Sequence, residues 1–317
     1  MNPEVELIRN NPGIDPTMHI WGWEVPVYLF LGGLTAGVMI LSALLPMHSK
    51  SKERSRWARY MIFSAPVIIS LGMGALFLDL AYKLHVFRFY TTFQVTSPMS
   101  WGAWILVAIY PATILLGLAE LTDDETDWLA GWKPLAMLRL GGLLRWARTL
   151  AQGRLGGLRW ANIALGVGLG GYTGILLGTL GARAMWNSSV LGPLFLVSGL
   201  STGAAFMMLF AVNHDEHRLL RRWDLAAIGL EVVLLSLFIL GLVTGGGEPG
   251  LRAVSLILGG KYTAPFWALV VAVGLAVPFL LELLESRKGA RPTRVAPALI
   301  LVGGLALRWI IVSAGQV

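Results

Sequence analysis

The chain has 317 residues, of which 56% are hydrophobic and only 14% are charged. A soluble domain carries about 25% charged residues, so this composition, with a mean hydropathy of +0.67, excludes an ordinary soluble protein. The net charge of +7 gives no support to nucleic-acid binding, because basic residues also orient membrane proteins and attract anionic lipid.

Eight apolar runs are long enough to cross a bilayer. Roughly 20 residues span the hydrocarbon core as a helix, and continuous rather than alternating hydrophobicity indicates helices instead of barrel strands. The runs cover 24–46, 60–82, 99–120, 160–181, 190–212, 225–244, 264–284 and 295–314. The sequence therefore predicts an all-α membrane protein with eight transmembrane helices. Residues 1–21 are polar, which predicts that no signal peptide precedes the first helix.

The basic residues separate into two groups when these runs are taken as helices. The first, third, fifth and seventh loops hold 18 of the 25 Lys and Arg residues. Because positive charge is retained in the cytoplasm, we expect those loops to be cytoplasmic, and both termini to be periplasmic, in a bacterial inner membrane.

The longest connection, the cytoplasmic loop 121–159, begins acidic and becomes basic. Its basic part carries Leu138, Leu143, Leu144 and Trp146 among arginines. This pattern is typical of a short helix lying in the headgroup layer. A solvated basic linker is the alternative.

A weak internal repeat joins the two halves of the sequence. The stretch GLTAG at 33–37 returns as GLSTG at 199–203, and a pair of prolines returns at nearly the same offset. Such a repeat is typical of two parallel four-helix halves. Small residues and prolines are also simply common in membrane helices, so both interpretations stay open.

The absence of cysteine and the positions of the histidines limit which redox cofactors the chain could hold. The chain has no cysteine, so it can hold no iron–sulfur cluster through thiolates and form no disulfide. Haem b in a membrane protein requires two histidines that face each other within the helices. The five histidines here lie instead in or beside loops: His19, His48, His85, His214 and His217. Redox chemistry would therefore fall to a lipid-soluble quinone or to a partner; no haem and no metal site is predicted.

Polar residues at membrane depth are costly and usually functional. Those toward the periplasmic side are Glu24, Asp79, Trp101 and Arg183, and Tyr172 lies at mid-depth in the fourth run. Quinone chemistry needs hydrogen-bond partners for both carbonyls and a route for protons to one surface. These five are therefore the candidate quinone-binding residues. Four of them also have a structural alternative. Glu24 would be a charge at headgroup level, and Asp79 would pair with a neighbouring helix. Arg183 would anchor its helix at the membrane interface, and Trp101 would belong to the interfacial aromatic belt.

The candidate proton relay combines residues from both ends of the sequence. It consists of Glu24, Asp79, Glu231 and Arg308. Glu231 lies in the inner half of the sixth run, and Arg308 lies in the outer half of the eighth. The alternative for Arg308 is a structural partner for a buried carboxylate.

Several stretches together resemble the NrfD/PsrC family, whose type member is the membrane subunit of polysulfide reductase. They are WGWEVPVYLFLGGLTAGV at 21–38, LDLAYKLHVFRFYTTFQVTSPMSWGAW at 78–104, YTGILLG at 172–178, PLFLVSGLSTGAA at 193–205 and GGLALRWIIVSAGQ at 303–316. The matches run in family order over most of the sequence, loop 121–159 excepted.

The resemblance implies two four-helix bundles, over 1–181 and 182–317, with a menaquinone or ubiquinone site in the first near the periplasmic face. It also implies a periplasmic ferredoxin-like iron–sulfur subunit that connects the site to a molybdopterin or multihaem catalytic subunit. Tyr172 matches the family tyrosine that hydrogen-bonds quinone. The polysulfide enzyme has an asparagine and a histidine at the start of the first helix, where this chain has Glu24 and Val27, so the histidine's role does not transfer.

Two other functions fit the sequence less well. A secondary transporter would be polytopic and repeated, but transporter sites usually lie at the midplane on broken helices, whereas the polar residues here gather toward one face. A proton-conducting subunit would need an inner half-channel, for which Glu231, Glu120 and Glu282 are available.

Overall fold

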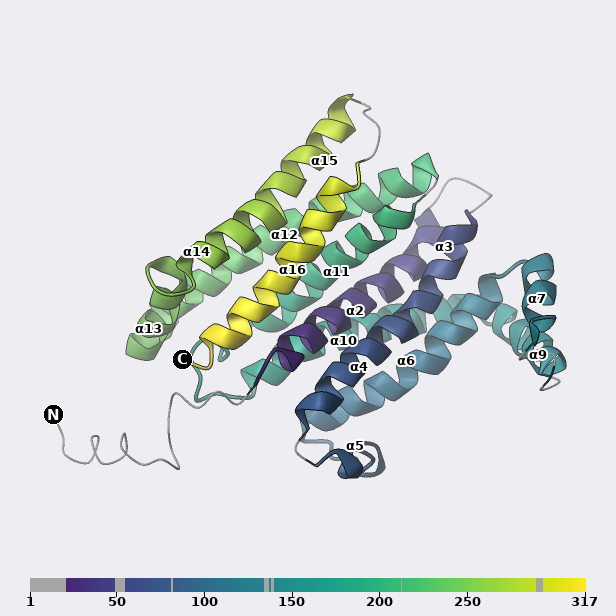
Figure 1. Cartoon of the computed structure of the whole chain (residues 1–317), viewed down its shortest axis with the longest axis horizontal. Coiled ribbons are helices and arrows are strands. Elements are labelled where there is room, and N and C mark those ends of the chain that lie inside the picture. Colours follow the sequence, from purple (N-terminus) through teal and green to yellow (C-terminus); the bar gives the residue numbers. More distant parts are fainter. Residues whose placement is uncertain are drawn as a thin grey trace.

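The computed structural model describes residues 21–48, 55–80, 82–133, 137, 140–211, 213–288 and 293–317. Within these residues every regular element is helical, and eight helices are long and apolar enough to cross a membrane. They run side by side as one sheaf (Figure 1). The predicted fold class and the number of crossings are confirmed. The predicted absence of a signal peptide and the position of His19 fall outside the described residues.

The first four crossings come from the N-terminal half. They are α2 (Glu24–His48), the composite of α3 (Arg56–Tyr60), η2 (Met61–Phe63) and α4 (Ser64–Asp79), then α6 (Pro98–Glu120) and α10 (Leu155–Gly178). The last four are α11 (Leu191–Phe210), α12 (His214–Gly245), the composite of α14 (Thr263–Pro265), the π-helix η4 (Phe266–Ala276) and α15 (Val277–Lys288), and α16 (Val295–Ala314). Shorter helices in the connections are η3 (Lys83–His85), α5 (Arg88–Thr91), α7 (Asp123–Ala130), α9 (Gly141–Gln152) and α13 (Gly247–Leu258).

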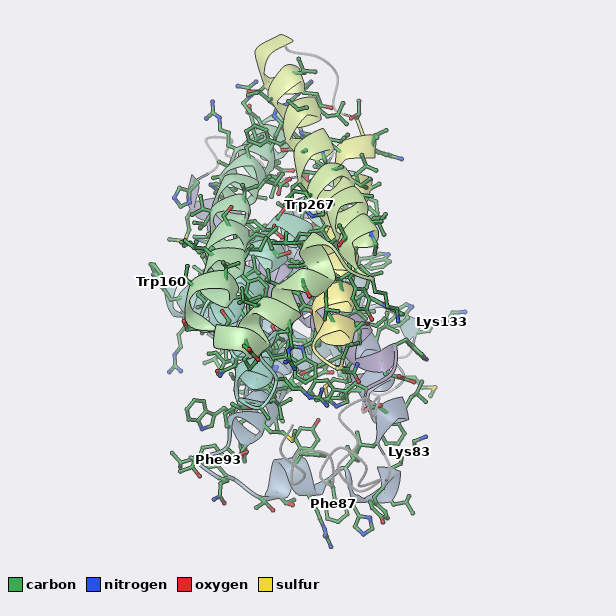
Figure 2. The ribbon with its side chains drawn as sticks, turned by 90° about the vertical axis from the view of Figure 1, so that its left-hand side faces the viewer. Lys83, Phe87, Phe93, Lys133, Trp160 and Trp267 are labelled. Atoms are coloured by element: carbon green, nitrogen blue, oxygen red, sulfur yellow. The ribbon has the colours of Figure 1, made fainter. Side chains whose placement is uncertain are left out.

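The two ends of the described sequence meet on one face of the sheaf. The Trp21 backbone N–H donates to Gln316 Oε1 at 2.9 Å, and Gln316 Nε2 donates to the Trp21 carbonyl at 3.0 Å. We call this side, which also carries α5 and α13, the terminal face, and the opposite side, which carries α7 and α9, the basic face (Figure 1). Lys83, Phe87 and Phe93 lie together at the terminal face (Figure 2). Its assignment to the periplasm stays a prediction from loop charge.

The two glycine motifs of the internal repeat pack directly against each other. A Cβ at Gly203 would lie 2.6 Å from the Gly37 Cα, and one at Gly199 would lie 2.7 Å from the Gly33 carbonyl oxygen. Small residues at these positions let α2 and α11 approach backbone to backbone. α2 also contacts α4, α10 and α16, so it is a central helix of the sheaf. The division into two bundles stays a prediction.

The sixth crossing begins earlier than predicted. We expected it over 225–244, but α12 begins at His214, where the Asn213 side chain accepts from the Asp215 N–H at 3.2 Å. The basic residues assigned to the fifth loop therefore lie on the first turns of a helix. The prediction was wrong because it took charged and polar residues to be exposed to solvent. His217 and Asp224 are instead buried on the face of α12 that points into the sheaf.

The connection 121–159 forms two short helices that pair through charges. Thr122 and Glu125 form a capping box at the start of α7. Asp127 pairs with Arg145 at 3.0 Å, and Asp123 pairs with Arg148. A helix, α9, thus forms where we expected one, with Leu143 and Trp146 exposed. Leu138 lies outside the described residues, and the position of α9 in the headgroup layer stays a prediction.

Candidate functional site

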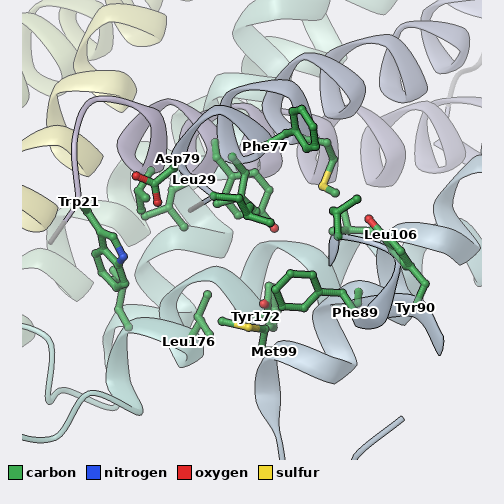
Figure 3. Close-up of a pocket in the computed structure, with 18 residues that line it drawn as sticks. Trp21, Leu29, Phe77, Asp79, Phe89, Tyr90, Met99, Leu106, Tyr172 and Leu176 are labelled. Carbon is green, nitrogen blue, oxygen red and sulfur yellow. The ribbon is translucent and has the colours of Figure 1, made fainter. Parts of the chain in front are cut away.

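A largely apolar pocket lies among the terminal-face ends of α2, α4, α6 and α10. It has a volume of about 230 Å³, and Phe89 and Tyr90 of α5 form part of its lining (Figure 3). The apolar side chains that line it include Leu29, Met73, Leu76, Phe77, Met99, Leu106 and Leu177. An apolar cavity of roughly 150 Å³ holds a benzene ring, so this pocket has room for a larger, substituted ring.

Three phenols and one carboxylate supply the polar groups of the pocket. Tyr28 and Tyr172 are buried, with 3% and 7% of their surface exposed. Tyr90 comes from α5, where burial raises the pKa of its hydroxyl and Tyr110 adds to the rise. It therefore stays a hydrogen-bond donor at neutral pH. Asp79, the last residue of α4, lies at the Trp21 end of the pocket, away from Tyr90 (Figure 3).

Tyr172 owes its position to a glycine on the neighbouring helix. A Cβ on Gly102 of α6 would overlap the Tyr172 ring and its hydroxyl oxygen. The bare backbone of α6 thus forms one wall against which the phenol lies. Gly102 follows Trp101 in the stretch 78–104 that carries the family resemblance.

The other predicted quinone-binding residues surround the pocket without lining it. Glu24, in the first turn of α2, is half-buried and within electrostatic range of Asp79. Arg183 donates from Nη1 to the Gln316 carbonyl at 3.2 Å. Trp101 is 46% exposed and donates from Nε1 to the Val95 carbonyl at 2.7 Å, which fastens the segment before α6.

A clasp of aromatic and amide groups holds the rim of the pocket. Trp21, which lines the pocket, stacks on Trp186 with ring centroids 4.9 Å apart. Trp186 is buried and donates from Nε1 to the Ile311 carbonyl at 2.9 Å. Gln316 binds Trp21 as described above and receives Arg183 at its carbonyl. These contacts connect Arg183 to the rim of the pocket and join the segment between α10 and α11 to the residues that follow α16 and precede α2.

A second hollow of about 530 Å³ adjoins the pocket on the terminal face. The two share Leu80, Phe89 and Met99. We call this hollow the vestibule; its remaining lining residues are Tyr82, His85, Arg88, Thr92, Gln94, Ser97 and Ser100. The pocket therefore borders a wider hollow at the terminal face, whose lining adds hydroxyl, amide, histidine and arginine side chains to apolar surface.

Glu231 and Arg308 lie elsewhere. Glu231 lines a separate, small cavity with Ser198, Ser201 and Thr202. Arg308 is fully buried beside it and donates to Ser198 Oγ at 2.7 Å. The four residues of the predicted relay thus fall into two groups, Glu24 with Asp79 and Glu231 with Arg308. Within the described part of the chain, no group of three or more His, Asp or Glu residues can hold a metal ion.

The family model described as "Polysulphide reductase, NrfD" matches residues 12–317. The chain belongs to the NrfD family. It is 30% identical to Protein NrfD of Escherichia coli over 94% of this sequence and 95% of that protein. It is 31% identical to a polysulfide reductase chain of Wolinella succinogenes over 94% of each. A selenate reductase subunit of Mesobacillus selenatarsenatis is 26% identical over 94% of this sequence and 74% of its own length.

Membership in the NrfD family confirms the resemblance drawn from the motifs. With the eight candidate spans, it identifies a multi-pass protein of the bacterial inner membrane. It also identifies a membrane subunit of a respiratory oxidoreductase.

Sequence reasoning on this NrfD-family protein missed Tyr28 and Tyr90. Tyr28 lies in an unbroken apolar run, where a tyrosine is easily taken for a belt residue. Tyr90 lies in a connection without periodicity, and only the fold brings it to the pocket. The aromatic richness of the stretch 87–93 was the one available signal.

Proposed function

We propose that this NrfD-family subunit exchanges electrons between the menaquinone or ubiquinone pool and a periplasmic ferredoxin-like iron–sulfur subunit. That subunit would serve a molybdopterin or multihaem catalytic subunit. The observation that carries the proposal is the apolar pocket that holds Tyr172 and Asp79 together at the terminal face. The chain is not expected to be catalytic alone.

The pocket fits a quinone ring by size and by chemistry. Its apolar lining suits the ring and the start of a prenyl tail, and its phenols suit carbonyl oxygens, which accept hydrogen bonds. A bound quinone or quinol supplies a two-electron, two-proton exchange. Tyr172 would donate to one carbonyl oxygen, with Tyr28 and Tyr90 as further donors. Asp79 would hold or release the proton at the other end of the pocket.

Glu24 would connect Asp79 to water at the terminal face. The two carboxylates are within electrostatic range of each other, and Glu24 stands in the first turn of α2. A carboxylate at the surface end of such a pair suits proton uptake or release on that side. Trp101 and Arg183 would support quinone binding indirectly, because each fixes a segment that borders the pocket.

The electron partner would dock over the vestibule. The chain has no cysteine and so holds no iron–sulfur cluster through thiolates, which supports an electron partner on another subunit. The segment beside the pocket exposes Phe87 and Phe93, each at 56%, next to Lys83 and Arg88. A mixed apolar and basic surface next to the redox site suits a partner with an acidic rim.

Photolabelling tests the pocket directly. The full chain in lipid nanodiscs would be irradiated with a ring-azido quinone, and labelled peptides would be mapped by mass spectrometry. We expect labels on peptides holding the ends of α2, α4 and α10 and the segment 86–99, all suppressed by excess menaquinone or ubiquinone. Labels confined to 182–317, or labels that excess quinone does not suppress, would contradict the site.

Co-purification tests the complex. We expect the chain to purify with a subunit whose iron–sulfur clusters give a paramagnetic resonance signal on quinol addition. A chain that purifies alone and moves a solute without quinone reactivity would instead support the secondary transporter.

A further inference from the structure

The apolar pocket is too small for a whole membrane quinone. Its volume of about 230 Å³ is only modestly larger than the roughly 150 Å³ that holds benzene, so a substituted quinone ring fills most of it. The prenyl tail then has to leave the pocket through one of its sides. Hydrocarbon is most stable away from water, so the tail should leave by a side that opens to lipid.

The two sides of the pocket that involve α2 are closed by direct helix contact. A Cβ on Gly72 of α4 would lie 3.3 Å from the Leu31 Cβ of α2. A Cβ on Gly32 of α2 would lie 3.7 Å from the Thr173 Cγ2 of α10. Small residues at both positions let α2 pack closely on α4 and on α10. A prenyl chain therefore has no room to pass on either side of α2.

The side between α6 and α10 is closed as well. A Cβ on Gly102 of α6 would overlap the Tyr172 ring of α10, and a Cβ on Gly168 of α10 would lie 3.4 Å from the Ile105 Cδ1 of α6. At the terminal face the pocket borders the vestibule, whose lining includes Arg88. A charged side chain next to water does not suit a hydrocarbon tail. The side between α4 and α6 is left.

The helices α4 and α6 approach each other closely at a level beyond the pocket. Toward the basic face, a Cβ on Gly117 of α6 would overlap the ring of Phe63, which precedes α4. Nearer the pocket, the Ser70 Oγ and the Tyr110 hydroxyl form a hydrogen bond of 2.8 Å across the two helices. The seam between α4 and α6 is therefore closed on the basic side of the pocket.

Beside the pocket, the facing sides of α4 and α6 line the cavity. Positions 99, 103, 106 and 110 lie along one side of α6, and positions 70, 73 and 77 lie along one side of α4. The side chains at 73, 77, 99, 103 and 106 all line the pocket. Phe77 is nevertheless 40% exposed, so the pocket reaches the outer surface of the sheaf here. We call this opening between α4 and α6 the lateral gap.

Gly74 leaves the edge of the lateral gap free of side chain. It lies four residues after Ser70 and three before Phe77, on the same side of α4. A Cβ at Gly74 would have no atom of the described residues within 4 Å. The surface beside the gap is apolar, because α4 exposes Leu78 at 54% and α6 exposes Val107 at 45%. An exposed apolar surface on membrane-spanning helices suits contact with lipid.

We propose that quinone enters the pocket sideways from the lipid through the lateral gap, and that its prenyl tail lies in this gap when the ring is bound. The proposal rests on the proposed function and assigns the tail a place. Phe77 and Leu106 lie at the end of the pocket opposite Trp21, whereas Asp79 lies at the Trp21 end (Figure 3). Hydrocarbon and proton thus use opposite ends of the pocket. Gly74 is the position that decides whether a tailed quinone can enter.

Two photoreactive forms of one prenylated quinone separate the ring from the tail. One carries an azide on the ring, and the other carries a diazirine on the second prenyl unit. The full chain in lipid nanodiscs would be irradiated with each and mapped by mass spectrometry. We expect the tail probe to label 70–78 and 103–111. Tail labels confined to 82–97 or to 182–317, with ring labels still in the pocket, would overturn the lateral gap alone. Ring labels outside the pocket would overturn the proposed function as well.

Gly74→Trp tests the gap by filling it. Overpacking by an indole should lower pocket labelling by the tailed ring-azido quinone by about tenfold. A ring-azido naphthoquinone without a tail, which can enter from water by the vestibule, should label the pocket as in the parent. Equal labelling of variant and parent by the tailed probe would overturn the proposal. So would an equal loss of both probes, because the indole would then act on the pocket and not on tail entry.

Gly241→Trp is the matched control. Gly241 lies four residues before the end of α12, as Gly74 lies five before the end of α4, and a Cβ at either position meets open space. The same indole at Gly241 should leave labelling by both probes unchanged. Gly74→Ala adds only a methyl group to open space and should also label like the parent. A tenfold loss of the tailed probe in Gly241→Trp would mean that an added indole anywhere on the lipid-facing surface hinders quinone, which would overturn the gap.

Discussion

The ring of Tyr172 on α10 lies against the bare backbone of Gly102 on α6, so the absence of one side chain gives the phenol its place in the pocket. This relationship links two of the stretches that carry the family resemblance, 78–104 and 172–178. Gly102 is far from Tyr172 in sequence and is not itself a polar site residue. Its effect on the site is steric.

Gly102→Ala should therefore impair quinol turnover while leaving the fold intact. The added methyl group would overlap the Tyr172 ring, which must then turn away from the wall. Overpacking of this kind costs about 1–3 kcal/mol. Gly171→Ala is the matched control, because a methyl at this neighbouring position on α10 meets open space. Quinol oxidation by the purified complex would be measured for both variants; equal rates would contradict the steric role of Gly102.

Tyr172→Phe should lower quinol turnover by about two- to tenfold, the effect of losing one hydrogen bond of roughly 0.5–1.5 kcal/mol. The ring and its packing on Gly102 remain, so assembly should not change. Tyr110→Phe serves as control, because the Tyr110 hydroxyl bonds Ser70 at 2.8 Å and does not line the pocket. Steady-state kinetics on the intact complex would check both. Unchanged turnover in Tyr172→Phe would remove this hydroxyl from the site.

Glu24→Gln should slow proton-coupled turnover and alter its dependence on pH. The amide cannot accept or release a proton at the surface end of the Glu24–Asp79 pair, so the rate should lose one titrating step. Asp79→Asn, inside the pocket, should be the more damaging change. The measurement is the pH–rate profile of the complex. A profile in Glu24→Gln identical to that of the parent would assign Glu24 to headgroup contact instead.

The lengths of the apolar runs predicted the eight crossings. A segment that crosses lipid must form all its backbone hydrogen bonds internally, so each long apolar run has to be a helix. It failed at the start of α12, where the stretch from His214 to Asp224 is so rich in charge that it read as a loop. Asp224 is nevertheless fully buried, held by Ser201 of α11 and faced by Glu282 of α15. This burial depends on the packing of three helices, so no local sequence pattern could have predicted it.

The site was predictable in part. Tyr172 and Asp79 were named from depth and resemblance, and both line one pocket. Arg183 and Trp101 were also named as quinone-binding residues; each donates a hydrogen bond to a backbone carbonyl, that of Gln316 and that of Val95 respectively, and their part in quinone binding stays a prediction. The sequence could not predict these contacts, because the direction of a long side chain depends on which carbonyls the fold brings near it.

Glu125 gives a pH prediction at the basic face. Burial alone would raise the pKa of this carboxyl, but hydrogen bonds from Arg59 and Thr122 outweigh burial and hold its pKa below the usual value. Arg59 Nη2 donates at 2.7 Å and the Thr122 N–H donates at 3.0 Å. Since the folded form binds its proton less readily than the unfolded form, Glu125 stabilises the α7 attachment fully at neutral pH. That contribution falls as the pH drops below the ordinary glutamate value of about 4.3.

Glu125→Gln should remove this pH dependence and loosen α7 at neutral pH. Deleting one partner of a largely buried, charge-assisted hydrogen-bond pair costs about 1–3 kcal/mol. Amide hydrogen exchange over α7 (Asp123–Ala130) would measure the local opening, with the parent expected to lose protection in acid and the variant already to lack it. Asp124→Asn removes the same charge from an exposed position of the same helix and should leave exchange unchanged. If both variants exchanged alike, net charge on α7, and not the Arg59–Glu125 contact, would hold this helix to the basic face.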